Sequence, residues 1–434
     1  MREGLKVQKG FLRVYAGMGV VLHPTCFAPK HIHYCVQLDL FDIPEKTSHN
    51  KLLTDLFQAY YQARKNKRNT INQLQFELQY EHHLLDLYDE ILERNYQPKR
   101  GICFIVHKPV KREIFAADFR DRVIHHLIYK YISPIFERSF INDSYSCRKG
   151  KGTHYGINRM DHFIRSCSHN FTRDCYVMKL DIRGYFMSMD RALLFEKVQS
   201  RLHRHRRSVD FDLPMVIFLI KKVIFNDSVQ NCTIKGKRSD WNDLPASKSL
   251  FHSPPGKGLP IGNLTSQLFG NVYLNELDHF VKRDLGIRYY GRYVDDFVLV
   301  HHDRYFLDRL VAIIAEYLQS QLQLTLHPDK KYLQHFSKGL PYLGAVIKPH
   351  RKYMARRTKG NLYLAIEKHN RVVRDHKPTS DEKYAFISCM NSYLGIMKHF
   401  KTYKMRKCLL FKNLSAYWWN IIRADGYKLF LLRR

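Results

Sequence analysis

Two segments in the first hundred residues place apolar side chains at helical spacing. They are residues 52–67 (LLTDLFQAYYQARKNK) and 81–95 (EHHLLDLYDEILERN), and in both the apolar residues recur every three or four positions. This spacing predicts two amphipathic helices, each with one buried face. The residues on these faces are Leu53, Leu56, Tyr60 and Ala63 in the first segment and Leu84, Leu87, Ile91 and Leu92 in the second.

The pattern then changes to short apolar runs. Residues 101–108 and 111–115 are typical of strands, and so is the segment 175–182 (CYVMKLDI). Helical spacing returns between them at residue 119, and we expect that helix to end at Pro134 because proline disrupts a helix interior. Asp190 precedes another helical stretch, where its side chain can act as the N-cap.

The second half of the chain mixes loops, strands and helices without regular alternation. Residues 225–258 are rich in Asn, Asp, Ser, Lys, Gly and Pro, which predicts a long loop or insertion. We expect a helix over about 266–282, two short strands within 287–302, and mostly helical structure after Pro349. Irregular mixing of strands and helices predicts an α+β fold rather than a doubly wound sheet.

The chain carries a large excess of positive charge. Its 434 residues include 72 Lys and Arg against 40 Asp and Glu, a formal net charge of +32. Such an excess implies an acidic partner, either nucleic acid or an anionic membrane surface. Basic runs lie at 108–112, 201–207 and 351–359, and this spread suits a long groove that follows a phosphate backbone. A solvated face is the alternative for any single run. No apolar run approaches the length of a membrane span, so we expect no membrane partner.

The nine cysteines show no C-x-x-C pair, and the sequence shows no signal peptide. This usage predicts a reducing, cytoplasmic location. Cys26, His31, His33 and Cys35 are close enough in sequence to hold zinc, but alternation along a strand accounts for them equally well.

Two adjacent carboxylates, Asp295 and Asp296, stand between apolar strand-forming runs in the segment YVDDF (293–297). Such a pair is repulsive and costly to desolvate unless a cation neutralises it; a solvent-exposed Asp-Asp turn is the alternative. Asp181, at the end of the apolar segment 177–182, adds a third carboxylate. Three acidic groups on hydrophobic strands suit two Mg²⁺ ions, with Mn²⁺ as an alternative. Two such ions roughly 3.5–4 Å apart would activate a 3′-hydroxyl and stabilise the leaving pyrophosphate.

The order and spacing of these motifs resemble those of reverse transcriptases. Asp181 matches motif A, the YVDD box about 114 residues later matches motif C, and the SQ-containing box between them matches motif B. The resemblance extends from about Leu52 to Arg406 and implies an RNA-directed DNA polymerase, a nucleotidyltransferase with a right-hand fold. The implied parts are an N-terminal extension of unknown role (1–48), fingers (49–169), a palm with a ferredoxin-like antiparallel sheet (170–350) and a helical thumb (351–434).

The same resemblance implies roles for individual residues. Asp181 and Asp295 would bridge the metal ions with help from the Ile182 carbonyl, and Asp296 would lie nearer the periphery. The implied nucleotide-binding residues are Phe186 as a steric gate against a ribose 2′-hydroxyl, Lys111 and Arg112 on the triphosphate, Lys330 as a proton donor to pyrophosphate, and Gln267. The implied template- and primer-binding residues are Arg148, Ile261, Gly262, Leu343 and Gly344. Ordinary roles stay open for Phe186 in a core, Arg148 in a solvated turn and Lys330 on the surface.

Motif B indicates a subtype. It reads GLPIGNLTSQLFGNVYLNELD (258–278), with Ile261 and Gln267 where group II intron and retron enzymes usually carry Gln and Pro. The Ile-Gly-x-x-x-Ser-Gln pattern is similar to reverse transcriptases of diversity-generating retroelements, in which the branched residue is associated with error-prone copying of template adenines. An apolar side chain cannot make glutamine's hydrogen bonds near the nascent pair, so pairing geometry is checked less strictly. A neutral packing substitution is the alternative.

The resemblance also implies partners: an RNA template, a DNA product, dNTPs, a structured non-coding RNA and a small basic accessory protein, in a bacterial or phage-encoded system. Two other functions stay open. One is an antiviral defence reverse transcriptase that makes DNA from an associated RNA or a protein primer. The other is a maturase-like RNA-binding protein that does not rely on polymerisation, against which the intact Asp181, Asp295 and Asp296 argue.

Overall fold

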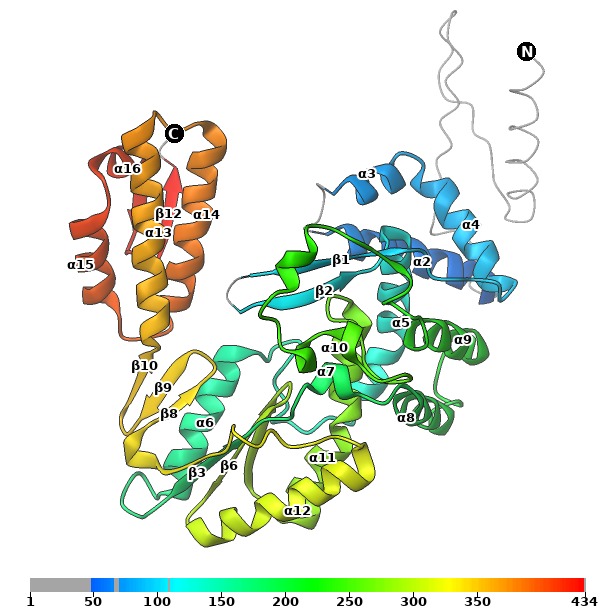
Figure 1. Cartoon of the computed structure of the whole chain (residues 1–434), viewed down its shortest axis with the longest axis horizontal. Coiled ribbons are helices and arrows are strands. Elements are labelled where there is room, and N and C mark those ends of the chain that lie inside the picture. The colour runs from blue at the N-terminus through cyan, green and yellow to red at the C-terminus, as the bar shows by residue number, and fades with distance from the viewer. Residues whose placement is uncertain (1–47, 66–69, 108–109, 433–434) are drawn as a thin grey trace, which may run out of the picture. The chain divides into compact units, whose positions relative to one another are not determined.

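The computed structural model of the protein describes residues 48–65, 70–107 and 110–432 (Figure 1). The described chain divides into two compact units, and each is discontinuous in sequence. The first unit takes in residues up to Arg100 together with 117–131 and 204–226, and the second takes in 101–116, 132–203 and 227 onwards. Residues Cys26 to Cys35, the candidate zinc ligands, and nearly all of the predicted N-terminal extension lie outside the described residues.

The first unit is built from helices with apolar inner faces. It contains α2 (Ser48–Arg64), α3 (Ile71–Glu77), α4 (Tyr80–Leu92), the first part of α5 (Phe119–Glu137) and α9 (Leu213–Ile224). The two helices expected from apolar spacing are therefore confirmed. The buried faces include Leu56, Tyr60, Leu84, Leu87 and Ile91, whereas Leu92 is 37% exposed and does not belong to the core.

Helix α5 does not end at Pro134, so that prediction is wrong. The helix continues to Glu137, and Pro134 lies on its exposed side. Ile132, Ile135 and Phe136 are buried around it. A carbonyl that loses its amide partner to proline can be hydrated on an exposed face, so the burial of the flanking residues outweighs the local cost.

The centre of the second unit is a four-stranded antiparallel sheet in the order β5-β6-β3-β7 (Figure 1). Its strands are β3 (Tyr176–Leu180), β5 (Tyr289–Tyr293), β6 (Asp296–His301) and β7 (Tyr332–His335). Helix α6 (Thr153–Cys167) packs against one face, where Val298 and Val300 of β6 join its apolar residues in one core. Residues 297–300 of β6 are all buried, which is the pattern of a strand covered on both faces.

Helices connect these strands. They are α7 (Tyr185–Ser188), α8 (Arg191–Arg204), α10 (Leu264–Tyr273), α11 (Asn275–His279), a π-helical turn (Phe280–Asp284) and α12 (Arg304–Leu322). The single helix expected over 266–282 is thus divided at Leu274 and changes its winding after His279. Asp190 caps α8 as predicted, because its Oδ1 accepts from the Leu193 amide at 2.9 Å.

The segment 225–258 is more ordered than its composition predicts. It contributes β4 (Cys232–Ile234), which runs parallel to β1 (Gly101–Val106) and extends the β1–β2 hairpin, where β2 is Arg112–Ala116. Three 3₁₀ turns follow, at Arg238–Trp241, Ala246–Lys248 and Leu250–His252. The buried Glu113 carboxylate accepts from Trp241 Nε1 at 2.7 Å, Ser249 Oγ at 2.8 Å and the Leu250 amide at 2.6 Å. A buried carboxylate bonded to three donors anchors the insertion.

The C-terminal part of the second unit begins with a three-stranded antiparallel sheet, β8 (Leu340–Tyr342), β9 (Ala345–Lys348) and β10 (Arg351–Met354), preceded by a 3₁₀ turn (Phe336–Lys338). Helices α13 (Arg356–Asp375), α14 (Ser380–Met397), α15 (Tyr403–Asn413) and α16 (Ala416–Ile421) follow, as expected after Pro349. The hairpin β11 (Ile422–Asp425) and β12 (Leu429–Leu432) was not predicted. Phe386 and Trp418, stacked with centroids 3.9 Å apart, lie in the common core of these elements.

None of the helices in the described ranges is long and apolar enough to cross a membrane.

Candidate active site

The adjacent aspartates lie at the tip of a tight hairpin. Tyr293 of β5 pairs with Asp296 of β6, so Val294 and Asp295 form a two-residue turn between the two short strands expected within 287–302. Val294 has a positive φ of 58°. A β-branched residue rarely adopts this conformation, which costs of order 1–3 kcal/mol and persists where the surroundings enforce it.

The third carboxylate comes from the neighbouring strand. Leu180 of β3 pairs with Phe297 of β6, and Asp181 follows Leu180 directly. Asp181 therefore lies at the same end of the sheet as Asp296. An antiparallel bridge between Ile182 and Leu326 holds this strand end: His327 N donates to Asp181 O at 2.8 Å and Arg183 N to Thr325 O at 2.9 Å. The Ile182 carbonyl takes no part in these two bonds.

Asp295 and Asp296 each have a pKa that is raised in part by neighbouring carboxylates. Burial, together with the negative charges of Asp181 and Asp296, raises the pKa of Asp295 to about 6. Burial also raises the pKa of Asp296, against the opposing charge of Lys179, whose Nζ is 3.1 Å from Asp296 Oδ2. Lys330 Nζ lies 2.9 Å from Asp181 Oδ1. Like charges brought together in a partly desolvated site form a place where a cation is stabilised.

The donor chemistry fits a hard divalent cation, but the carboxylates are not arranged around one. No group of three or more His, Cys, Asp or Glu side chains in the described chain has the geometry of a metal site. The two lysines explain this, because their amines draw the Asp181 and Asp296 carboxylates into ion pairs. Carboxylate oxygens are hard ligands that suit Mg²⁺, and a cation would compete with the two amines for them.

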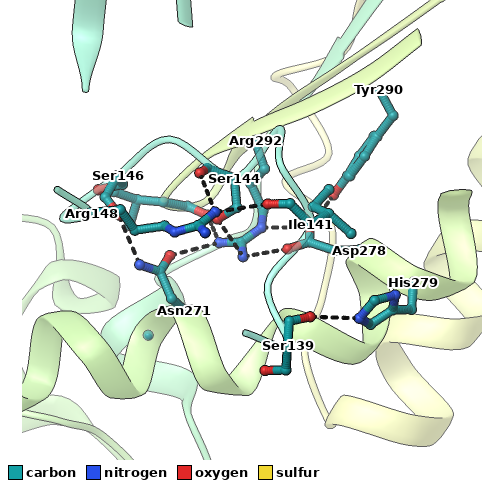
Figure 2. Close-up of polar contacts among 12 residues, drawn as sticks. Ser139, Ile141, Ser144, Ser146, Arg148, Asn271, Asp278, His279, Tyr290 and Arg292 are labelled. Carbon is teal, nitrogen blue, oxygen red and sulfur yellow. Dashed lines mark hydrogen bonds and ion pairs between the residues drawn. The ribbon is translucent and has the colours of Figure 1, made fainter. Parts of the chain in front are cut away.

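A buried ion pair between Arg292 of β5 and Asp278 of α11 stabilises the β5–β6 hairpin (Figure 2). The fully buried Arg292 donates to both Asp278 carboxylate oxygens, at 2.8 and 2.6 Å, and its Nη1 donates to the Val294 carbonyl at 2.8 Å. Tyr290 hydroxyl also donates to Asp278 Oδ1, at 2.7 Å, and Arg292 Nη2 is 3.3 Å from Ser144 Oγ. Arg292 therefore links helix α11 to the strained turn that carries Asp295. Sequence reasoning missed this pair, although a charged residue within an apolar strand was a signal.

Phe186 lies in the segment that follows Asp181. Gly184 turns the chain with a φ of 55°, and α7 then places the Tyr185 and Phe186 rings against α10. Tyr185 is buried and its hydroxyl donates to the Gly270 carbonyl at 2.5 Å. A Cβ added at Gly270 would lie 3.2 Å from Phe186 Cζ, so the half-buried Phe186 ring packs closely on this glycine.

The start of motif B contacts the β1–β2 hairpin. Ile261 is half-buried against the core formed by Cys103, Phe115, Met187 and Leu250, and its carbonyl accepts from the Phe115 amide at 2.8 Å. Gly262 has a φ of 135°, and a Cβ there would lie 2.5 Å from the Phe115 carbonyl oxygen. This close backbone approach requires glycine. Gln267 is exposed on α10.

The remaining predicted contacts occupy different environments. Arg112 is exposed at the start of β2, and the Lys111 amine is hydrogen-bonded to the Asn242 carbonyl of the insertion. The Arg148 side chain is only 7% exposed and donates to Glu137 Oε2, Ile141 O and Ser144 O at 2.7–2.9 Å (Figure 2). A nucleic-acid contact by Arg148 stays a prediction, and it would require these bonds to be exchanged.

Leu343 and Gly344 form the turn between β8 and β9, with φ values of 47° and 81°. Leu343 packs beside Gly156 of α6, and Gly344 is exposed. The contact of these two residues with a primer stays a prediction.

Residues 98–347, more than half of the chain, match the family described as reverse transcriptase (RNA-dependent DNA polymerase). The chain is also similar to protein YkfC of Escherichia coli strain K12, at 25% identity over 292 residues that cover 59% of this chain and 69% of that protein.

Similar solved structures include apo telomerase from Candida tropicalis, truncated from its C-terminal domain (TM-score 0.40, 13% identity, 57% of this chain and 53% of that one). Another is telomerase from Candida albicans in complex with a fragment of telomeric RNA (TM-score 0.42, 12% identity, 77% of this chain and 64% of that one). This chain thus spans between half and two thirds of the length of these two telomerases. From the family match over residues 98–347, we conclude that the chain belongs to the reverse transcriptase family.

Proposed function

We propose that the protein is an RNA-directed DNA polymerase that makes cDNA by nucleotidyl transfer at Asp181, Asp295 and Asp296. The observation that carries the proposal is the convergence of these carboxylates at the end of β3 and the tip of the β5–β6 hairpin, with the pKa of Asp295 raised by burial and by its acidic neighbours. We assign the three side chains and the Ile182 carbonyl to two Mg²⁺ ions, with Mn²⁺ as an alternative. When bound, such ions activate a 3′-hydroxyl and stabilise pyrophosphate.

The chain's own residues position the reactants. Lys330 is proposed as the proton donor to pyrophosphate, which is supported by its amine lying 2.9 Å from Asp181. Lys111 and Arg112, at the start of β2, are proposed to bind the triphosphate, because guanidinium and ammonium groups match phosphate oxygens. Gln267, exposed on α10, is proposed to contact the same nucleotide.

Two glycine-containing turns on the same unit support the proposed template and primer contacts. Gly262 brings the backbone beside Ile261 onto the β1–β2 hairpin, which supports a contact of Ile261 with the nascent base pair. The exposed Gly344 at the tip of β8–β9 supports a backbone contact with the primer, beside Leu343, and Arg148 is proposed to contact the template.

We further propose that copying is error-prone at template adenines, as in a diversity-generating retroelement with its structured RNA and a small basic accessory protein. Ile261 supports this because an apolar side chain offers no hydrogen bond with which to test the nascent pair. In the alternative function, antiviral defence, the same centre would make DNA on an associated RNA or a protein primer. A template-repeat and variable-repeat pair beside the gene would favour the first function, and a cluster of defence genes the second.

Replacing Ile261 with glutamine tests the subtype. We expect Ile261→Gln to lower misincorporation opposite template adenine about tenfold, the effect of ~1.4 kcal/mol in discrimination. The measurement is sequencing of cDNA made on a defined RNA, with Ile261→Val as the matched control that keeps a branched apolar side chain and the wild-type error rate. Low, uniform error at adenines in the wild-type protein would contradict the subtype and leave the polymerase assignment standing.

Replacing Phe186 with alanine tests the steric gate. Because the ring packs on Gly270, a smaller side chain would leave space beside the incoming sugar. We expect Phe186→Ala to raise the efficiency of ribonucleotide use relative to deoxynucleotide use by about a hundredfold. Single-nucleotide extension with each substrate measures this ratio. Tyr185→Phe is the control, since it removes the hydroxyl bonded to Gly270 and keeps both rings; an unchanged ratio in Phe186→Ala would remove the gate assignment.

A further inference from the structure

The second unit contains two adjacent cavities that the proposed reaction does not use. The first, of about 530 Å³, lies between the C-terminal half of α6, the turn that joins β9 to β10, and the connection from α14 to α15. It is lined by Asp161, Arg165, Phe171, His350, Arg351, Lys352, Lys398, His399, Phe400 and Lys401. The second, of about 510 Å³, shares Arg165 and is otherwise lined by His162, Ser166, His169 and Asn170.

The lining of the first cavity is strongly basic. Five of its residues are Lys or Arg, and Asp161 is the one acidic residue among those that line it. Lys352 Nζ is 3.8 Å from Asp161 Oδ2 and 2.7 Å from Asn158 Oδ1, so that acid is already matched by one of the cations. The charge of Arg165, Arg351, Lys398 and Lys401 is therefore not balanced within the cavity. A concave surface of one sign concentrates ions of the other.

Aromatic rings stand among these cations. Phe171 meets His350 edge to face with ring centroids 4.6 Å apart, and His399 stacks on His154 of α6 at 3.7 Å. Phe400 lies next to His399 in the same wall. Cations that contact phosphates, interleaved with rings on which bases stack, are the usual composition of a surface that binds a single nucleic-acid strand.

The cavities lie at the opposite end of the central sheet from the three carboxylates. Phe171 and Asn170 precede β3, whereas Asp181 follows it, and five residues of strand separate the two ends. At about 3.3 Å per residue that is roughly 16 Å. Likewise His350 lies beyond the end of β9 that is remote from the Leu343–Gly344 turn. This surface is thus separate from the proposed catalytic and primer contacts.

We propose that the two cavities form a second binding site for the phosphate backbone of a single nucleic-acid strand. Each cavity is within the size range of small-ligand sites, about 300–1,000 Å³. Arg165, which lines both, lies where consecutive phosphates of one strand would pass from one to the other. The site would hold RNA that is not being copied, or cDNA that has left the reaction centre, and it does not depend on the identity of the catalytic residues.

The test compares two variants with the same change of charge. Arg165→Glu with Lys398→Glu alters the cavities, and Arg304→Glu with Arg309→Glu alters exposed positions of α12 that line neither cavity. Binding of fluorescent unstructured 20-nucleotide RNA and DNA of one sequence is measured over a range of salt. A saturating unlabelled primer–template is present to occupy the reaction centre.

We expect the cavity variant to lose at least about tenfold in affinity for one or both strands. The plot of log affinity against log salt is expected to become less steep by about 1–2, which is about one for each lost phosphate contact. If the variant loses more affinity for RNA than for DNA, the ligand of the site is RNA; the reverse result identifies DNA. Primer extension on a short duplex and the thermal unfolding midpoint should match the wild type.

An equal loss in the α12 variant would overturn the proposal, because the effect would then be general charge, and so would unchanged binding in the cavity variant. An equal loss of affinity for a polyglutamate peptide would overturn the assignment to nucleic acid. If Arg165→Glu impairs folding, Lys398→Glu with Lys401→Glu provides the same comparison, with the same change of charge, on the α14–α15 connection.

Discussion

The Asp295→Asn variant is expected to lose primer extension on an RNA template by at least about 10³-fold while becoming more stable to heat. A neutral amide cannot replace a carboxylate that holds divalent ions at the reacting phosphate, and such electrostatic stabilisation contributes roughly 4 kcal/mol or more. The initial rate of extension at saturating dNTP measures the loss. Asp381→Asn, the same change at an exposed position in the first turn of α14, should leave the rate unchanged.

The stability gain follows from the sign of the pKa shift. Burial and the charges of Asp181 and Asp296 raise the pKa of Asp295 to about 6, above its ordinary value of 3.8. The folded protein therefore binds a proton more tightly than the unfolded chain, and stability falls as pH rises from about 4 to about 6. At pH 8 without divalent ions, Asp295→Asn should recover about 3 kcal/mol, seen as a higher unfolding midpoint.

Two outcomes would contradict this prediction. A variant that kept more than a tenth of the wild-type rate would show that Asp295 is not at the reaction centre. An unfolding midpoint of Asp295→Asn that is lowered at pH 8 and unchanged by divalent ions would also contradict it. Such a result would show that the Asp295 carboxylate stabilises the fold as a hydrogen-bond acceptor, and that repulsion from its neighbours does not destabilise the fold. The joint result, inactive and more stable, is the behaviour of a functional group kept at a cost to the fold.

The strands that carry the three aspartates were predictable because their signals are local in sequence. The β5–β6 hairpin follows from two apolar runs around Asp295 and Asp296, and Asp181 ends a third apolar run. What the sequence could not show was the set of partners that these groups meet. The Lys179 and Lys330 ion pairs depend on how β3, β6 and the loop after Leu326 are brought together, which residue spacing does not encode.

The misses have a common physical cause, which is tertiary packing that overrides local preference. Composition predicts a loop at 225–258, but Glu113 from a distant strand satisfies three donors there and β4 finds a partner in β1. Proline predicts the end of a helix at Pro134, but buried side chains on both sides continue it. The assignment of individual residues to template, primer and nucleotide needs a bound complex, because Arg148 and Lys111 are engaged with the protein itself.

Removal of the Arg292 charge is expected to destabilise the second unit strongly. Arg292→Met would leave Asp278 buried without its cationic partner, and breaking a buried pair in this way costs about 3–5 kcal/mol. Equilibrium urea unfolding measures the loss. Arg288→Met, at an exposed position in the same segment, is the matched control and should change stability by less than about 0.5 kcal/mol.

The conservative variant separates support of the hairpin from simple stability. Arg292→Lys keeps the charge beside Asp278 but cannot donate at once to both carboxylate oxygens and to the Val294 carbonyl, because an ammonium group lacks the planar fork of guanidinium. Val294 would then be free to relax from its positive φ and move Asp295 with it. We expect a folded protein with kcat reduced about 10- to 100-fold and little change in KM for dNTP, since a misplacement near 1 Å has effects of this size. Wild-type kcat in Arg292→Lys would show that the guanidinium stabilises the sheet without positioning the carboxylate.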